Sequence, residues 1–367
     1  MTRIGYHASH EQFAPDELLG FVPAAERAGF GAAKSSDHFH PWGERQGQSG
    51  FAWTWLGAAL QSTSLPFGIV SAAGYRYHPA VLAQAAATAG LMYPGRFWLA
   101  LGSGEAINEA ITGKPWPEKS ERNALLRECV EVTRALFAGE TVTHRGRVTV
   151  IDAKLYSRPT PPIPLYGAAV SADTARFVGG WADGLLTTAS NDSGAVRRVI
   201  DAFHDGGGEG KPVVLQAALS WAADDAGALR EATDQWAHCL IGGDAMWDLR
   251  RSQDFDTVAR RATADQLRAV LPISSSLAFH QEWIGRLLDL QPAELHLHNV
   301  GRNQREFIEA FGARVLPGLA ADNPAPAAGS AGPREGQVIR RRRTASTDAL
   351  GAATAERDRE ASATRRE

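Results

Sequence analysis

Short apolar runs alternate with longer segments of helical periodicity along residues 1–319. Eight apolar runs have the length and the flanking turn residues of buried strands, and they span 3–8, 32–36, 66–71, 97–101, 164–167, 184–188, 212–220 and 294–298. The helical segments between them include 15–29, 79–92, 117–137, 171–182 and 193–204. This alternation predicts an α/β fold in which helices cover a parallel sheet.

Two architectures share this alternation, the doubly wound open sheet and the closed (β/α)8 TIM barrel. A doubly wound dinucleotide-binding domain needs a G-x-G-x-x-G sequence directly after its first strand, and none follows residues 3–8. The catalytic residues of a TIM barrel instead follow the ends of several strands. Because ionisable residues follow several of the predicted strands here, we predict a TIM barrel.

The composition changes after Leu319. Residues 321–367 contain no aromatic side chain and include four successive arginines at 340–343. Such a segment cannot bury enough apolar surface to offset the entropy lost on ordering. We therefore predict one barrel domain over residues 1–319 and a disordered Ala/Arg-rich tail over 320–367. The arginine run is interpreted as a solvated charge cluster rather than a nucleic-acid patch.

Composition and charge argue against nucleic acid and membranes as binding partners of this protein. Hydrophobic residues make up 44% of the 367 residues, and 38 basic residues nearly balance 41 acidic ones, so no positive field would collect nucleic acid or anionic lipid. Neither a signal peptide nor a run of about 18 apolar residues is present, which argues against a membrane span. Two distant cysteines, Cys129 and Cys239, argue against a disulfide scaffold. We expect a cytoplasmic protein with a small-molecule substrate.

Ionisable and aromatic side chains follow the first four predicted strands. They include His7, Glu11, Asp37, His38, His40, Trp42, Glu105 and Asn108. In a closed barrel these residues would converge on one mouth, where imidazole and carboxylate groups suit acid–base catalysis. The alternative is an ordinary set of polar loops. The joining of ionisable groups to Gly or Pro turns in SSDHFHPW and LGSGEAINE favours the functional interpretation.

His38 and His40 also form an H-x-H pair, which can hold a metal ion in barrel hydrolases. Such a centre needs further ligands from later strands, and no histidine occurs between His144 and His204. A metal-dependent hydrolase is therefore a remote alternative, and no metal site is predicted. The small residues at 166–171 join a predicted strand to a helix, where free N–H groups could hold a phosphate.

Five segments resemble the luciferase-like family of flavin- and deazaflavin-dependent oxidoreductases. They are GYHASHEQF, SSDHFHPW, YRYHPAVLAQAAAT, YPGRFWLALGSGEAINE and HNVGRNQREFIEAFGARVLP. The resemblance runs from Ile4 to Leu319 and is closest to the branch of coenzyme F420-dependent glucose-6-phosphate dehydrogenases and to its FMN-dependent, non-F420 subgroup. It implies a (β/α)8 barrel with a flavin or deazaflavin ring across the strand ends, and a homodimer.

The resemblance also implies roles for individual residues. His38 matches the histidine that exchanges a proton with the substrate, Trp42 a tryptophan beside the reacting centre, and Glu105 a general acid. Cofactor contacts are expected at Asp37, Ile69, Val70, Ala72, Asn108, Gly167, Ala168 and Ala169, and substrate contacts at His7, Glu11 and His40. Relatives carry a non-proline cis peptide bond beneath the ring, which would join Ile69 and Val70 here at a cost of about 3 kcal/mol.

Departures from the relatives bear on the substrate. A threonine of the sugar-phosphate dehydrogenases corresponds to Ala72, which lacks its hydroxyl group. Those enzymes hold the substrate phosphate with lysines from the second half of the barrel, whereas the last lysine here is Lys211. Arg260, Arg261 and Arg268 could bind a phosphate instead. Glucose 6-phosphate is nevertheless not the expected substrate.

The expected exit path of the cofactor passes residues 74–76 and 168–171. This path offers Arg76 and Arg176 but no lysine for the glutamate-bearing tail of F420, whereas FMN ends at a phosphate that one helix N-terminus can satisfy. We therefore predict FMN as the cofactor, with coenzyme F420 as the alternative. The predicted reaction is hydride transfer between a small organic substrate and this cofactor.

Overall fold

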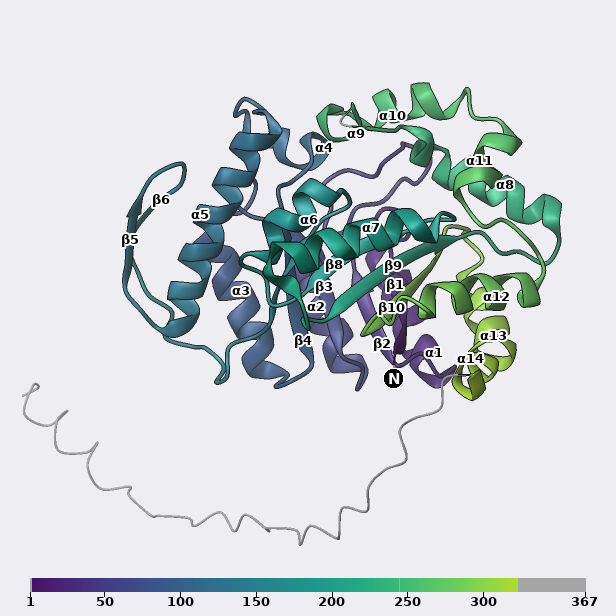
Figure 1. Cartoon of the computed structure of the whole chain (residues 1–367), viewed down its shortest axis with the longest axis horizontal. Coiled ribbons are helices and arrows are strands. Elements are labelled where there is room, and N and C mark those ends of the chain that lie inside the picture. Colours follow the sequence, from purple (N-terminus) through teal and green to yellow (C-terminus); the bar gives the residue numbers. More distant parts are fainter. Residues whose placement is uncertain (1, 244, 323–367) are drawn as a thin grey trace, which may run out of the picture. The chain divides into compact units, whose positions relative to one another are not determined.

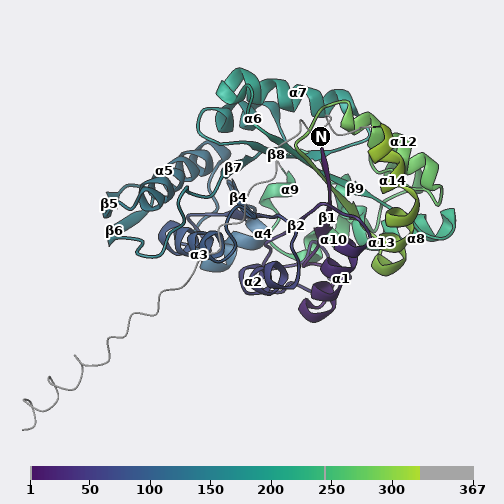
Figure 2. The same ribbon diagram turned by 90° about the horizontal axis from the view of Figure 1, so that it is seen from below.

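Eight parallel strands close into a barrel at the centre of the computed structural model, which describes residues 2–243 and 245–322 (Figures 1 and 2). The strands are β1 (Arg3–Ala8), β2 (Ala32–Ser35), β3 (Phe67–Ala72), β4 (Phe97–Gly102), β7 (Leu165–Ala168), β8 (Leu185–Ala189), β9 (Val213–Leu219) and β10 (Glu294–Asn299). Around the barrel they follow the order β1, β10, β9, β8, β7, β4, β3, β2. The predicted TIM barrel is thus confirmed.

All eight predicted strands are present, and their ends differ from the prediction by at most one residue. Strands of a parallel barrel are buried on both faces, so each reads as a continuous apolar run. Strand β4, FWLALG, for example, is buried at every position except the last. This burial explains why the apolar runs located the barrel.

Helices cover the outside of the barrel (Figure 2). The longer ones are α1 (Pro15–Arg27), α2 (Ala52–Ser62), α3 (Pro79–Met92), α5 (Lys119–Ala138), α6 (Ala172–Gly179), α7 (Ser193–Phe203), α8 (Asp225–Trp236), α12 (Leu277–Leu288) and α13 (Gln304–Arg314). The shorter ones are α4 (Ala106–Glu109), η1 (Ala110–Thr112), η2 (His204–Gly208), η3 (Ala237–Leu240), α9 (Ala245–Asp248), α10 (Ser252–Ala259), α11 (Ala264–Val270) and α14 (Leu316–Asp322). Proline in the first turn begins α1 and α3, and Ser171 caps the N-terminus of α6.

Two parts of the structure are missing from the sequence prediction. An antiparallel hairpin of β5 (Val142–Arg145) and β6 (Thr149–Ala153) lies outside the barrel beside α5 (Figure 1). Its strands are short and largely exposed, so no apolar run marks them. The segment between β9 and β10 contains the short helices η3, α9, α10 and α11, which are too brief to show a clear helical period.

The peptide bond between Ile69 and Val70 is trans, contrary to the expectation from the resemblance. Strand β3 pairs with β4 in unbroken register across this bond, with Ile69 opposite Leu99 and Val70 opposite Ala100. This continuous ladder leaves no irregularity in which a strained bond would be held. Among the described residues, the cis bond is Thr160–Pro161.

Side chains fill the amino-terminal half of the barrel interior. The ring of Trp98 stacks on Tyr166 with 5.1 Å between centroids, and its Nε1 donates to Glu294 Oε2 at 3.2 Å. His296 Nε2 donates to the same oxygen at 2.9 Å. Gly68 lies opposite Trp98 on the neighbouring strand, where a Cβ atom would collide with the indole. The open space inside the barrel therefore lies toward the carboxyl ends of the strands.

The last described helix, α14, runs to Asp322, three residues beyond the predicted domain end at Leu319. Residues 323–367, which make up most of the predicted disordered tail, lie outside the described part of the chain. None of the helices within residues 2–243 and 245–322 is both long enough and apolar enough to cross a membrane.

Candidate functional site

A cavity of about 550 Å3 opens at the carboxyl ends of the barrel strands. Its floor consists of polar side chains from the barrel interior, among them His7, Lys34, Gln216 and His298. Apolar side chains from the opposite strands form one wall, including Val70, Ala72, Ala168 and Leu186. Trp42 and residues from 236–243 and 245–247 form the side nearest the mouth. The cavity thus has a polar floor and two largely apolar sides.

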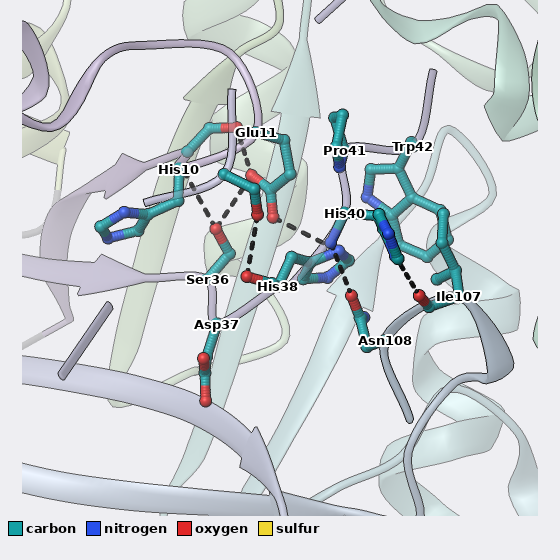
Figure 3. A network of polar contacts seen from close by, with 12 residues as sticks. His10, Glu11, Ser36, Asp37, His38, His40, Pro41, Trp42, Ile107 and Asn108 are labelled. Atoms are coloured by element: carbon teal, nitrogen blue, oxygen red, sulfur yellow. Dashed lines mark hydrogen bonds and ion pairs between the residues drawn. The ribbon is translucent and has the colours of Figure 1, made fainter. Parts of the chain in front are cut away.

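His38 lies between two carboxylates at this end of the barrel, and Figure 3 shows it beside Glu11. Its Nδ1 is 3.6 Å from Glu11 Oε1, and its Nε2 is 3.5 Å from Glu105 Oε2. The three residues come from the loops that follow β2, β1 and β4. Both ring nitrogens of His38 therefore face an acid.

Glu11 is buried and held by two hydroxyl groups. Ser9 Oγ donates to Glu11 Oε2 at 2.7 Å, and Ser36 Oγ donates to the same oxygen at 2.9 Å (Figure 3). Burial would raise the pKa of Glu11, but the neighbouring His38 and these hydrogen bonds outweigh it and lower the pKa to about 2. Glu11 is therefore an ionised, fixed neighbour of His38 at neutral pH.

Glu105 sits at the start of α4 with its side chain 23% exposed. Asn108 Nδ2 donates to Glu105 Oε2 at 3.0 Å, while Asn108 Oδ1 accepts from the Phe39 amide at 2.9 Å. Asn108 thus connects the loop after β2 to the loop after β4. Burial raises the pKa of Glu105, although His38 opposes the shift. The two acids beside His38 consequently have pKa values displaced in opposite directions.

Trp42 covers one side of His38, with 4.8 Å between ring centroids. The indole stacks on the imidazole of His238 at 5.3 Å and packs edge-on against Phe255 at 5.2 Å. Burial lowers the pKa of His238 to about 3, so its ring is neutral and stacks as an aromatic group. This contact attaches the segment after α8 to the loop that carries His38.

Asp37 points away from His38 and is fully hydrogen-bonded. Its Oδ2 accepts from Ser71 Oγ at 2.5 Å, and its Oδ1 accepts from Tyr77 Oη at 3.0 Å. The guanidinium of Arg76 lies 3.3 Å from Oδ1. Asp37 lines the cavity, but its carboxylate binds this cluster of β3 and the loop after it.

Arg76 also compensates a second buried acid, Glu109. Its backbone amide donates to Glu109 Oε2 at 2.8 Å, and its Nε lies 3.6 Å from Oε1. Burial raises the pKa of Glu109 to about 7, although Arg76 opposes the shift. One guanidinium thus stands between two acids, Asp37 and Glu109, that have almost no exposure to solvent.

Two cations border the cavity where α6 begins. Lys119 Nζ donates to Ser171 Oγ, the cap of α6, at 3.4 Å, and Arg122 lies one turn further along α5. Both side chains line the cavity. The expectation that this path offers no lysine is therefore wrong, because α5 packs beside residues that lie about fifty positions later in the sequence. Arg176, expected here, is instead 53% exposed and pairs with Asp173 and Asp205.

Most of the candidate residues line one cavity. They are His7, Glu11, Asp37, His38, Trp42, Val70, Ala72, Glu105, Asn108, Ala168 and Ala169. Ile69, His40 and Gly167 do not line it. The Ile69 side chain is fully buried on the other face of β3, His40 Nδ1 donates to the Ile107 carbonyl at 2.7 Å, and Gly167 packs against Val178. Successive side chains of a strand alternate in direction, which explains why Val70 faces the cavity and Ile69 does not.

Residues 236–243 and 245–247 form the largest part of the cavity wall that the sequence analysis missed. They contribute Trp236, His238, Cys239, Ile241, Met246 and Trp247. The feature of the sequence that could have indicated this wall is a pair of tryptophans, Trp236 and Trp247, in a region without a clear helical period. The described residues contain no group of three or more His, Cys, Asp or Glu side chains that could hold a metal ion.

Residues 1–274 match the family model described as luciferase-like monooxygenase. The chain belongs to this family. It is therefore an oxidoreductase, as its relatives are. Proteins of Microbacterium testaceum and Segniliparus rotundus, both named F420-dependent glucose-6-phosphate dehydrogenase, are 35% and 36% identical to it. These alignments cover 86% of this chain in each case, and 97% and 98% of the two relatives.

Solved structures share the same barrel. An F420-dependent secondary alcohol dehydrogenase, determined in complex with an F420–acetone adduct, is 29% identical with a TM-score of 0.80, over 87% of this chain and 99% of that one. A coenzyme F420-dependent tetrahydromethanopterin reductase from Methanopyrus kandleri is 19% identical with a TM-score of 0.70, over 86% of this chain and 99% of that one. At that identity, the second likeness concerns the fold.

The position of Arg76 between two buried acids leads to a prediction about stability. Arg76→Met leaves Asp37 and Glu109 without their cation, so we expect a loss of roughly 3–5 kcal/mol in the free energy of unfolding at pH 8. Without Arg76 the pKa of Glu109 rises further above its value in the unfolded chain, so the loss grows as the pH increases past about 7. Urea denaturation of variant and wild type at pH 5 and pH 8 measures both effects.

Arg176→Met is the matched control, because Arg176 is exposed and its acidic partners are exposed as well. It should change the free energy of unfolding by no more than about 0.5 kcal/mol at either pH. A loss for Arg76→Met that is equal at both pH values would contradict the assigned role of Glu109.

Proposed function

We propose that this protein is an F420-dependent oxidoreductase that moves a hydride between the cofactor and a small, uncharged organic substrate. The observation that carries the proposal is Lys119, whose Nζ contacts Ser171 at the cavity edge. Arg122, which pairs with Asp248 at 3.6 Å, adds a second cation to the cavity lining. F420 continues past its phosphate into a glutamate-bearing tail, which gains from cations along its path, whereas FMN ends at the phosphate. The preference for FMN depended in part on a path without lysine, and Lys119 removes that reason.

The cavity suits such a cofactor in shape and in chemistry. Its volume of about 550 Å3 is within the range of small-molecule sites, and Val70, Ala72 and Ala168 offer an apolar wall to an aromatic ring. The N-terminus of α6 with Ser171 would hold the phosphate, and Lys119 and Arg122 the tail. When bound, the deazaflavin ring supplies a carbon atom that accepts or donates a hydride. The names of the relatives support the same cofactor.

His38 is the residue we assign to proton transfer. The ionised Glu11 beside Nδ1 favours the tautomer that carries its proton there, which leaves the lone pair of Nε2 facing the cavity. Nε2 can then take the hydroxyl proton of an alcohol as the hydride leaves the adjacent carbon, and return it in the reverse reaction. Glu105, partly exposed and 3.5 Å from Nε2, connects this nitrogen to solvent.

The side of the cavity nearest the mouth indicates an uncharged substrate. It is lined by Trp42, Trp236, Ile241, Met246 and Trp247. Of the described cavity-lining cations, Arg76 is paired with Asp37 and Glu109, Lys34 lies in the floor, and Lys119 and Arg122 lie at the cofactor edge. Arg260, Arg261 and Arg268 do not line the cavity. A phosphate in this part would lose its hydration without gaining a cation, which is unfavourable.

The cofactor assignment predicts binding of F420 at least tenfold tighter than binding of FMN, measured by titrating the purified apoprotein with each cofactor. Lys119→Met should weaken F420 binding by about tenfold, equivalent to about 1.4 kcal/mol, and change FMN binding less. Lys154→Met removes an exposed lysine outside the cavity and should change neither. FMN binding as tight as F420 binding would contradict the proposal.

The proton-transfer assignment predicts that His38→Ala and Glu105→Gln each lower kcat by about 10²- to 10⁴-fold without loss of cofactor binding. Steady-state turnover and cofactor titration of each variant measure the two quantities. His40→Ala should lower kcat far less, because His40 does not line the cavity. Equal losses for the two histidines would rule out a specific role for His38.

The substrate assignment predicts a preference that differs from the names of the curated relatives. In the presence of F420, kcat/KM for simple secondary alcohols should exceed that for glucose 6-phosphate by at least about 100-fold, or about 2.7 kcal/mol. The absorbance of F420 during turnover provides the measurement. A preference for glucose 6-phosphate would disprove the uncharged-substrate assignment and leave the cofactor assignment standing.

A further inference from the structure

Three basic side chains form a row across the cavity floor, on the adjacent strands β10, β1 and β2. They are His298, His7 and Lys34. His7 and Lys34 are register partners on parallel strands, so their side chains point the same way, and the rings of His7 and His298 are 4.5 Å apart. All three side chains are buried. The row therefore faces the cavity from the barrel interior.

Lys34 is the unusual member of this row. It is fully buried, and its Nζ has no hydrogen-bond partner among the described residues. The nearest acid that influences it, Glu11, is already engaged by Ser9, Ser36 and His38. A buried ammonium without a partner is strongly unfavourable, so such a group is seldom retained for stability. The ammonium has free donors directed at whatever occupies the cavity.

The two histidines beside Lys34 add no positive charge of their own. Burial lowers the pKa of His298 to about 3 and the pKa of His7 well below its usual value, so both rings are neutral at pH 7. Val70 and Leu186, which line the same cavity, are apolar. Among the described residues of the floor, Lys34 is thus the group that can offer a positive charge to the occupant.

Hydride transfer creates the negative charge that this cation can meet. With F420 bound, oxidation of a substrate alcohol would break its C–H bond and pass the hydride to a ring carbon of the cofactor, while the hydroxyl proton would go to His38. The substrate would leave as an uncharged carbonyl compound, and the cofactor would gain two electrons and one proton, and so one negative charge. A nearby buried cation stabilises that charge strongly because little water screens it.

We propose that Lys34 is the counter-charge for the reduced cofactor, and that it makes this protein bind reduced F420 more tightly relative to oxidised F420. The inference depends on the proposed function, because it concerns the same cavity and cofactor. Lys34 lies within strand β2 rather than in a loop after a strand, and proton transfer is assigned to His38. Lys34 is a residue that adjusts the redox balance of the bound cofactor.

The experiment measures dissociation constants of oxidised and reduced F420, under anaerobic conditions, for the wild type and for Lys34→Met. The variant should lose at least tenfold in the ratio of reduced to oxidised affinity, which corresponds to a drop of about 30 mV in the potential of the bound two-electron couple. Lys119→Met is the matched control, since it removes a cavity lysine at the tail end. It should weaken both redox forms by the same factor and leave the ratio unchanged.

A second readout separates this role from a structural one. Burial lowers the pKa of Lys34 to about 7, so at pH 6 the folded protein carries this charge at a cost that the unfolded chain does not have. Lys34→Met should therefore raise the melting temperature of the apoprotein at pH 6 by about 2 °C or more. Lys34→Gln, which also removes the charge, should show the same loss in the affinity ratio and guards against a packing artefact of methionine.

An unchanged affinity ratio in both Lys34 variants would overturn the proposal, and so would a lower melting temperature with equal weakening of both redox forms. An unchanged ratio with a raised KM for substrate would assign Lys34 to an anionic substrate instead. If the wild type binds neither form of F420, the proposed cofactor itself fails, and this role fails with it. If the wild type binds both forms, only the assignment of Lys34 is at stake.

Discussion

Closure of the parallel barrel is the constraint on which the rest of the structure depends. Strand β1 pairs with β10 from Arg3 opposite Glu294 to Tyr6 opposite Leu297, which joins the two ends of the domain and leaves no unpaired edge. Because every strand is parallel, all carboxyl ends lie on one side. That geometry alone brings the loop after β1 and the loop after β4 to either side of His38.

Polar groups of the barrel interior differ in how fully they are hydrogen-bonded, and unpaired nitrogens occur in both halves, His296 Nδ1 among them. In the amino-terminal half, Glu294 accepts from Trp98 and His296 and pairs with Arg3, so a buried acid is fully compensated. In the carboxyl half, Lys34 Nζ and His7 Nδ1 have no partner among the described residues. Unpaired buried groups are costly, and here they face the one cavity at the strand ends. Stability is thus given up where a ligand can restore the missing interactions.

Residues of the candidate site could be predicted from the sequence only where an ionisable side chain comes directly after a predicted strand. His38 and Glu105 met that condition, since each comes directly after an apolar run. Lys34 did not, because it lies inside a predicted strand and its direction depends on how the barrel closes. Lys119 belongs to a helix that looks amphipathic in sequence, and only packing against the start of α6 turns it toward the cavity. His40 was predicted to contact the substrate because it lies near His38 in sequence. Its side chain instead contacts the Ile107 carbonyl and does not line the cavity.

The sequence by itself determined the fold class, the eight strands and the family, because burial on both faces and local turn signals are properties of short segments. The resemblance to the family also pointed to an oxidoreductase. Only the tertiary structure decided which side chains share the cavity, that the Ile69–Val70 bond is trans, and that cations border the start of α6. The reason is physical: the direction of a side chain, its burial and the charges around it arise from contacts between segments far apart in the chain, and no local pattern encodes those contacts.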